Sequence, residues 1–420
     1  MKTGKIIRYV ILVLLAAGIL VYFYNESRKG SDFNVFLQAA QQLLHGKNIY
    51  TIWFRVNSSG LLYFYSPLFA LTMVPFSFLP PAITNFLWLL ADVFFLYRIA
   101  IILAKISGAD LLRNKQLYIL ASFSFLLTAR FLIYNFDLVQ MTIFLLYASL
   151  ESIYFFHRGK KIPGAILLAL AINIKILPLI LIPYLIFRKK FTESALTVLF
   201  TATTLILPAI FLGFRYNTFL LSEWWASIDP LKADHTSGEV HLGLHSLSAL
   251  VTGLFTDSVD KVEIKRYIAI LAPETISYLI NGLRAFFILL SLVFLRYIPF
   301  RKAKSDLHSL WELSYLFTIT PLIFPHQQKY AFFYLLPACF YIVFFLIKAN
   351  ADGQKPVSKR RIYLIWGLMI LVFALTTLTT DGLIGRELNN ITQHFKLITY
   401  GTILLIIPLG LSNPKYLQAT

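Results

Sequence analysis

Long apolar runs alternate with short polar segments along almost the whole chain. Ten of these runs approach the length of a membrane-spanning helix, which needs about 17–25 mostly apolar residues. The pattern predicts membrane helices at 6–23, 83–104, 117–134, 138–156, 194–212, 274–295, 309–324, 330–347, 362–379 and 396–411.

Two further apolar segments need a different placement. The segment 67–79 is short and is ended by Pro80-Pro81, so we expect it to lie flat or half-embedded at the outer membrane surface. The segment 162–187 carries Lys175 and Pro178 near its middle. Because proline removes a helix hydrogen bond, we expect a hairpin of two short helices that breaks around these residues.

Basic residues predict the orientation of the segments, since Lys and Arg concentrate in cytoplasmic loops. The predicted cytoplasmic clusters are Lys105, Arg113 and Lys115; Arg158, Lys160 and Lys161; Arg188, Lys189 and Lys190; Arg296, Arg301, Lys302 and Lys304; and Lys355, Lys359, Arg360 and Arg361. The result is about twelve membrane segments with both chain ends cytoplasmic. Asp32, the 130–137 connection, the 213–273 loop, His326 and the 380–395 loop then lie on the outer face.

Composition agrees with an all-α polytopic membrane protein. Of the 420 residues, 58% are hydrophobic and only 14% are charged, which leaves too little polar surface for a soluble chain of this size. The first apolar run lacks a small-residue cleavage pattern, so we expect an uncleaved helix, with a cleaved signal as the alternative. The net charge of +18 comes from Lys and Arg residues that concentrate in the predicted cytoplasmic loops, so no nucleic acid partner is expected. The single Cys339 excludes an intrachain disulfide framework.

Several short stretches follow one another in an informative order. They are Ser31-Asp32-Phe33-Asn34-Val35-Phe36, Tyr65-Ser66-Pro67-Leu68-Phe69-Ala70-Leu71 and Ala171-Ile172-Asn173-Ile174-Lys175-Ile176-Leu177-Pro178, with weaker matches at Leu244-His245-Ser246-Leu247 and Pro325-His326. Together they resemble glycosyltransferase family 87, within the GT-C superfamily of membrane glycosyltransferases that use polyprenyl-phosphate sugars. The chain departs from the family pattern at Ser66, where relatives usually have proline, and in the run Asn135 to Gln140.

The resemblance implies a GT-C fold and an inverting transfer reaction. The donor would be a polyprenyl-phosphate-linked hexose, most often mannose in this family, and the acceptor a lipid-linked or other glycan. The expected location is the outer face of a bacterial-type cytoplasmic membrane, among membrane lipids. The implied organisation is one domain over 1–420, with a GT-C module at 1–187 and a variable membrane module at 188–420.

Asp32 is the position that matches the catalytic base of the superfamily. A departing phosphate needs no general acid, so one carboxylate can suffice, unlike the pair that hydrolyses an ordinary glycosidic bond. Asp32 would take the proton from the acceptor hydroxyl. The alternative is that Asp32 caps a helix starting at Phe33.

The departing phosphate requires cations on the outer side of the membrane, and His326, Lys329 and Arg130 are the first candidates. The candidates for the donor phosphate and sugar are His326, Lys329, Arg130, Lys175 and Tyr65. Arg130 and Lys329 could instead reach from helix ends to the membrane interface. Lys175 could instead bond carbonyl groups freed at the helix break.

The acceptor site is assigned to Asn135, Asp137, Gln140 and His245. The His-containing segment 234–245 is more typical of a polar entrance loop than of a zinc site, because it has no dense ligand motif. Asp137 also lacks the second acid of an Asp-x-Asp motif, so we expect catalysis without a metal or another cofactor. Trp224 and Trp225 could stack on a sugar ring, but two neighbouring tryptophans beside a membrane more often lie in the belt of aromatic residues at its interface.

A transporter or flippase of lipid or sugar is the alternative class, and an inactive, scaffold-like relative is a third. Transporters typically show repeats and paired broken helices. This sequence has one broken helix and no evident repeat, while its largest polar loops fall on one predicted side. The pattern therefore favours an enzyme.

Overall fold

The computed structural model describes residues 2–56, 59–257, 262–295, 299–349 and 357–417, which are mostly helical. Arg296 and Lys355, two members of the predicted basic clusters, lie outside the described residues. Every predicted span overlaps a helix. The bundle is built from α1 (Lys2–Ser27), α4 (Pro81–Ser107), α5 (Asn114–Leu138), α6 (Thr142–His157), α7 (Lys161–Ile174), α8 (Leu181–Phe187), α9 (Phe191–Ile206), α13 (Pro273–Phe294), α14 (Asp306–Ile323), α15 (Leu336–Ala349), α16 (Lys359–Thr376) and α19 (Leu397–Leu411).

Shorter elements connect these helices. They are α2 (Phe33–Leu44), α3 (Pro67–Ser77), α10 (Ala209–Leu212), α11 (Phe214–Ile228), α12 (Leu247–Phe255), α17 (Asp381–Ile384) and α18 (Arg386–His394), the 3-10 helices η1 (Ala109–Leu111), η2 (Leu177–Ile180), η3 (Ala233–His235), η4 (Lys329–Leu335) and η5 (Pro414–Tyr416), and the antiparallel strands β1 (Phe54–Val56) and β2 (Ser59–Leu61).

Six helical segments within the described residues are long and apolar enough to cross a membrane. They are Pro81–Ser107, Asn114–Leu138, Phe191–Leu212, Pro273–Phe294, Lys329–Ala349 and Leu397–Tyr416. The chain is therefore a multi-pass membrane protein, as predicted. The full count of about twelve segments stays a prediction.

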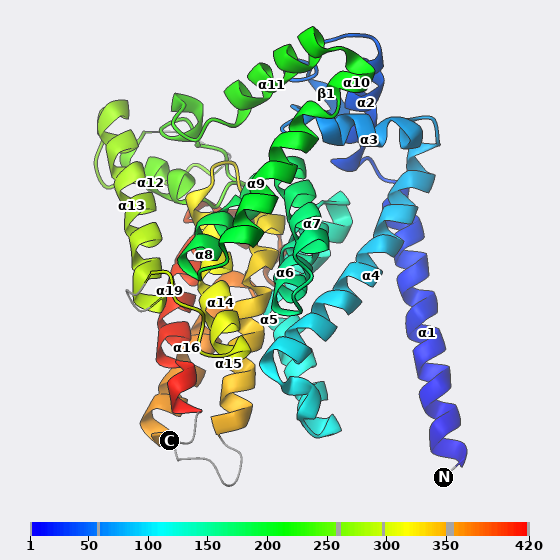
Figure 1. Ribbon diagram of the computed structural model, residues 1–420. Coiled ribbons are helices and arrows are strands. Elements are labelled where there is room, and N and C mark those ends of the chain that lie inside the picture. Colours follow the sequence, from blue (N-terminus) through cyan, green and yellow to red (C-terminus); the bar gives the residue numbers. More distant parts are fainter. Residues whose placement is uncertain (1, 57–58, 258–261, 296–298, 350–356, 418–420) are drawn as a thin grey trace.

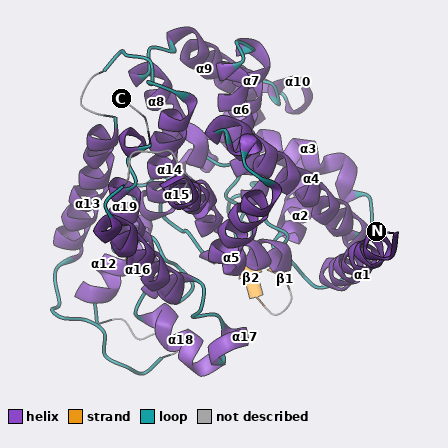
Figure 2. Ribbon diagram, turned by 90° about the horizontal axis from the view of Figure 1, so that it is seen from below, coloured by secondary structure: helices purple, strands orange, loops and turns teal. Residues whose placement is uncertain are grey.

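The central helices α14 and α15 lie within a ring formed by the other helices (Figure 2). Every residue from His308 to Ile323 is buried, and so are the first eleven residues of α15. A buried ion pair fixes α14 to the end of α8: Arg188 Nε donates to Glu312 Oε2 at 2.9 Å. Arg188 therefore belongs to the packed core, although the sequence grouped it with a cytoplasmic basic cluster.

The segment 162–187 breaks where the sequence predicted. Helix α7 ends before Lys175, whose backbone is extended (φ −148°, ψ 132°), and the chain continues through η2 into α8. Lys161 at the start of α7 lies 4.0 Å from Glu193 at the start of α9, measured between Nζ and Oε1. The residues that precede and follow the segment thus meet at one end of the bundle, as in a hairpin.

The amphipathic helix α2 and the apolar helix α3 lie across the end of the bundle opposite the termini (Figure 1). Pro67 occupies the first turn of α3, where a missing N–H costs little. Ser66 caps that helix, because its Oγ accepts the Phe69 N–H at 3.3 Å. Serine at this position thus has a clear structural purpose in place of the proline of relatives.

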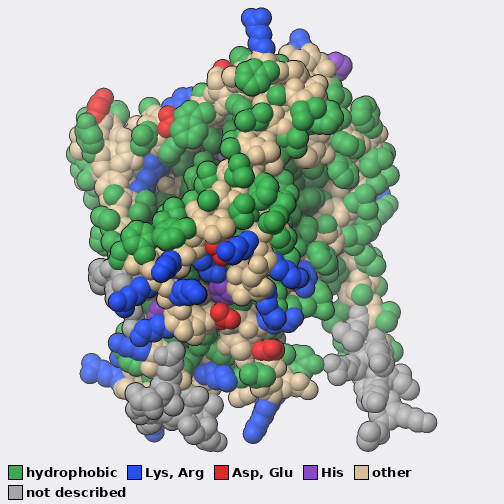
Figure 3. Space-filling view, viewed as in Figure 1, with side chains coloured by type: hydrophobic (Ala, Val, Ile, Leu, Met, Phe, Trp, Pro, Cys, Tyr) green, Lys and Arg blue, Asp and Glu red, His purple; other side chains and the backbone are tan. Residues whose placement is uncertain are grey.

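Lys and Arg side chains gather at the end of the molecule where both termini lie (Figure 3). A broad hydrophobic surface covers the helices above them. This segregation of charge is what the positive-inside pattern predicted. Polar groups of the opposite end converge on a cleft.

Candidate active site

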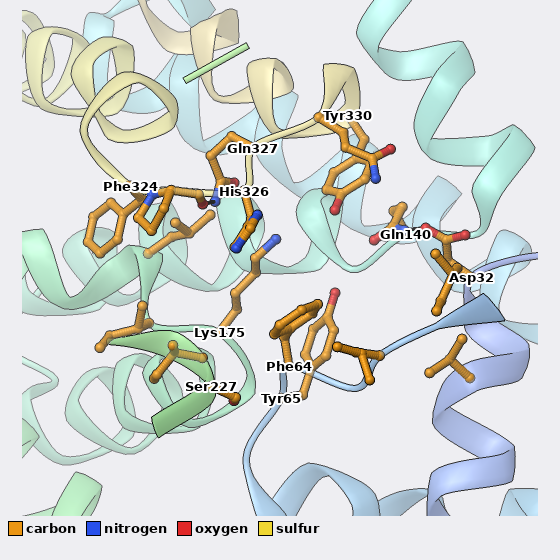
Figure 4. A pocket seen from close by; sticks show the side chains of 18 of the residues that line it. Asp32, Phe64, Tyr65, Gln140, Lys175, Ser227, Phe324, His326, Gln327 and Tyr330 are labelled. Atoms are coloured by element: carbon orange, nitrogen blue, oxygen red, sulfur yellow. Dashed lines mark hydrogen bonds between the residues drawn. The ribbon is translucent and has the colours of Figure 1, made fainter. Parts of the chain in front are cut away.

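The cleft, counted together with the open solvent at its mouth, encloses about 1050 Å³ and lies where α2, η2, α11 and the 324–330 segment meet (Figure 4). One part carries polar groups, namely Asp32, Gln140, Lys175, Tyr65 and Tyr330. The rest is mostly apolar, with Leu177, Trp224, Ile228, Leu244 and Phe324 among its lining residues. The cleft therefore suits a ligand with a polar head and a hydrocarbon chain.

Asp32 immediately precedes α2, but its side chain makes no capping hydrogen bond. Its Oδ2 instead accepts a hydrogen bond from Gln140 Nε2 at 2.6 Å. Burial raises the pKa of Asp32 to about 6, against the Gln140 hydrogen bond and the Lys175 charge, which both lower it. The carboxylate is thus largely ionised at pH 7 and more basic than an ordinary aspartate.

Lys175 reaches the cleft because α7 stops one residue before it. Its Nζ lies 5.1 Å from the centre of the Tyr330 ring and 6.0 Å from that of Tyr65, within range of cation–π attraction. Among the described residues, the ammonium group has no hydrogen-bond or ion-pair partner. A half-buried cation in this position can accept an anionic ligand.

His326 lines the cleft from the loop between α14 and η4. Its ring stacks on Phe64, with centroids 5.7 Å apart, and meets His235 edge-on at 4.4 Å. Burial, followed by the neighbouring His235 and Lys175, lowers the pKa of His326 to about 4. His326 is therefore neutral near pH 7 and can serve as a hydrogen-bonding group, whereas the sequence suggested a cation.

Lys329 and Arg130 do not line the cleft. The Nζ of Lys329 lies over the Tyr134 ring at 4.4 Å, and that ring stacks on Tyr330. Arg130 is buried and donates hydrogen bonds to Thr376 O, Thr379 Oγ1 and Asn389 Oδ1 at 2.9, 2.6 and 2.7 Å. These contacts attach α5 to the end of α16, to the residue Thr379 beyond it and to α18. The role of Arg130 at the donor stays a prediction.

Only one of the four predicted acceptor residues lines the cleft. Gln140 lines the cleft, whereas Asn135 is buried and donates to the Tyr330 carbonyl at 3.0 Å. Asp137 accepts from the Tyr22 hydroxyl at 2.6 Å. His245 is fully buried, and its backbone N–H donates to the Gln327 carbonyl at 2.8 Å. Asn135 and His245 thus support the 327–330 backbone.

Several lining residues were missed or judged differently from the sequence. Trp224 is buried and donates from Nε1 to the Phe64 carbonyl at 3.2 Å, whereas its neighbour Trp225 is 55% exposed. The two tryptophans therefore have different roles. Tyr330 entered the sequence analysis only through the weak match that begins at Pro325-His326, and nothing in the sequence predicted its contact with Lys175. Within the part of the chain that the structure describes, no group of three or more His, Cys, Asp or Glu side chains could hold a metal ion.

The fold and the cleft together define a helical, multi-pass membrane protein with a carboxylate and a cation beside an apolar wall. A family model for glycosyltransferase family 87 matches residues 63–325, which is more than half of the chain. The chain therefore belongs to glycosyltransferase family 87 and is a glycosyltransferase. No curated protein matches it. The matched residues include Tyr65, Gln140 and Lys175, while Asp32 and His326 lie outside them.

Proposed function

We propose that this protein transfers a hexose, in the most specific form mannose, from a polyprenyl-phosphate donor to a lipid-linked or other glycan acceptor. The observation that carries the proposal is the position of Asp32 and Lys175 at the polar part of a cleft whose remaining wall is mostly apolar. A donor of this class combines a sugar, a phosphate and a long hydrocarbon chain, and the cleft offers surfaces of each matching kind. The proposed site faces the outer side of a bacterial-type cytoplasmic membrane.

Asp32 is the proposed general base. Its pKa of about 6, raised by burial, leaves it ionised at pH 7 while strengthening its pull on the acceptor hydroxyl proton. The acceptor oxygen would attack the anomeric carbon as the bond to the donor phosphate breaks, and the proton would pass to Asp32. Attack opposite the leaving phosphate inverts the anomeric centre.

Lys175 is the proposed partner of the donor phosphate. Negative charge grows on the phosphate as the sugar departs, and a preorganised cation stabilises that charge most in a site with little water. His326, neutral near pH 7, would add a hydrogen bond, and Tyr65 would pack against the sugar or phosphate. We propose that Gln140 orients Asp32 and that no metal ion takes part.

The test is transfer of radiolabelled sugar from a polyprenyl-phosphate donor in membranes that contain the protein. Asp32→Asn keeps the size of the side chain but removes the proton acceptor, so transfer should fall at least about 10²-fold. Asp110→Asn, which changes an exposed carboxylate on η1, is the matched control and should leave transfer unchanged. Retained transfer in Asp32→Asn would reject Asp32 as the base.

A further inference from the structure

Glu239 is a buried carboxylate that lies outside the cleft and behind the His326 loop. Only 1% of its surface is exposed. Its Oε1 accepts the backbone N–H of His326 at 2.5 Å and lies 3.7 Å from Nδ1 of the same residue. Its Oε2 accepts from the hydroxyl of Ser246, which in turn caps α12 through the Ala249 N–H. The carboxylate therefore joins the His326 loop to the first turn of α12.

The backbone of His326 needs such support. Its φ is +56°, in the left-handed region that residues with a side chain rarely adopt and that surrounding contacts must hold. Neighbouring contacts fix the next residues: His245 N–H donates to the Gln327 carbonyl, and Leu244 forms a β-bridge with Gln328. The N–H of His326 itself is held by Glu239.

We infer that Glu239 is a positioning residue, which holds the left-handed backbone of His326 and thereby presents its imidazole to the cleft. This inference rests on the proposed function, because it takes His326 to face the donor. It also gives part of the long 213–273 segment a role, since its residues 239–246 brace the 326–328 loop from behind.

The charged and titratable groups around Glu239 come from several elements. Arg284 on α13 and Lys396 before α19 act on it electrostatically, and His326 lies against it. The His235 ring on η3 contacts the His326 ring edge-on. Burial raises the pKa of Glu239 to about 7, against the hydrogen bonds from Ser246 and His326, which lower it. Glu239→Gln therefore distinguishes two effects of Glu239, because glutamine can accept the same hydrogen bond but carries no charge at any pH.

The test measures amide hydrogen exchange of the 324–330 segment in the purified, full-length protein. Glu239→Ala, and the shorter Glu239→Asp if the alanine variant does not accumulate, should speed exchange in this segment. Glu239→Gln should keep exchange near the wild-type rate, because its carbonyl oxygen can still accept the His326 N–H. Glu223→Ala is the matched control, since Glu223 also makes a long-range hydrogen bond, to Asn48 at 2.7 Å, without contacting the loop. Unchanged exchange in both Glu239→Ala and Glu239→Asp would overturn the inference.

Sugar transfer provides the second readout. Glu239→Ala should lower turnover by about 10²-fold, and Glu239→Gln should restore most of it. The double variant Glu239→Ala, His326→Ala should be no slower than His326→Ala alone, because both changes remove one function. Additive losses would mean that Glu239 acts elsewhere and would overturn the inference. If the wild-type protein shows no transfer, the proposed function fails, while the exchange data still decide whether Glu239 holds the loop.

Discussion

The Tyr330 ring stacks on the Tyr134 ring, with centroids 6.4 Å apart and planes inclined by 12°. Lys175 lies over Tyr330 and Lys329 over Tyr134, so each lysine contacts a different ring of the stacked pair. The sequence placed both lysines beside one phosphate. In the structure Lys175 lines the cleft, whereas Lys329 and the Tyr134 ring beneath it do not.

This separation predicts unequal effects of the two lysines. Lys175→Met should reduce transfer by about 10²-fold and raise the KM for the donor, because it removes the cation that faces the cleft. Lys329→Met should have a smaller effect, since its cation does not line the cleft. Initial rates measured against donor concentration check this. Equal losses in both variants would show that the donor phosphate contacts the Lys329 side as well.

The activity should depend on pH through Asp32. Below a pH of about 6 the carboxyl becomes protonated and cannot accept the acceptor proton, so kcat/KM should fall as the pH is lowered through that value. Gln140→Leu removes a hydrogen bond that lowers the pKa of Asp32, so the acidic fall should move to higher pH. Gln38→Leu serves as the control, because it removes a glutamine hydrogen bond that does not involve Asp32. Gln38 on α2 donates to the Arg55 carbonyl on β1 at an exposed position. A fall that stays near pH 4 in the wild type would contradict the raised pKa.

The placement of the chain in the membrane can be tested by cysteine labelling. In a Cys339→Ser background, cysteines at the exposed positions 231 and 385 should react from outside the cell. Cysteines at the exposed positions 160 and 189 should react only after permeabilisation. Labelling of 160 and 189 from opposite sides would disprove the hairpin at 162–187, and reversal of all four would invert the sidedness of the proposed site.

The ion pair between Arg188 and Glu312 should matter for stability. Arg188→Ala leaves Glu312 as a buried charge without its main partner, which typically costs about 3–5 kcal/mol of unfolding free energy. The midpoint of thermal unfolding in detergent should therefore drop clearly. Lys189→Ala, at the exposed neighbouring position, should leave the midpoint near the wild-type value. Similar midpoints in both variants would show that the pair adds little.

Much of the helical framework could be predicted because its signals are local. Apolar runs predicted the helices, and Lys175 followed by Pro178 predicted the break in 162–187. The roles of individual polar residues were harder to predict, because their partners lie far away in the sequence. Arg130 bonds residues about 250 positions later, and Glu239 bonds His326. Asp32 was singled out by its place in the first outer loop and by its family position, whereas its hydrogen bond from Gln140 is known only from the fold.

The groups of the proposed site stand at the ends of different helices: Asp32 follows α1, Gln140 follows α5, Lys175 follows α7 and His326 follows α14. Their mutual distances therefore depend on how these helices tilt and slide against one another. Helix tilt responds to the match between helix length and hydrocarbon thickness. The thickness of the surrounding bilayer thus becomes a variable of the chemistry, and lipids with shorter or longer chains should tune the turnover of an otherwise unchanged protein.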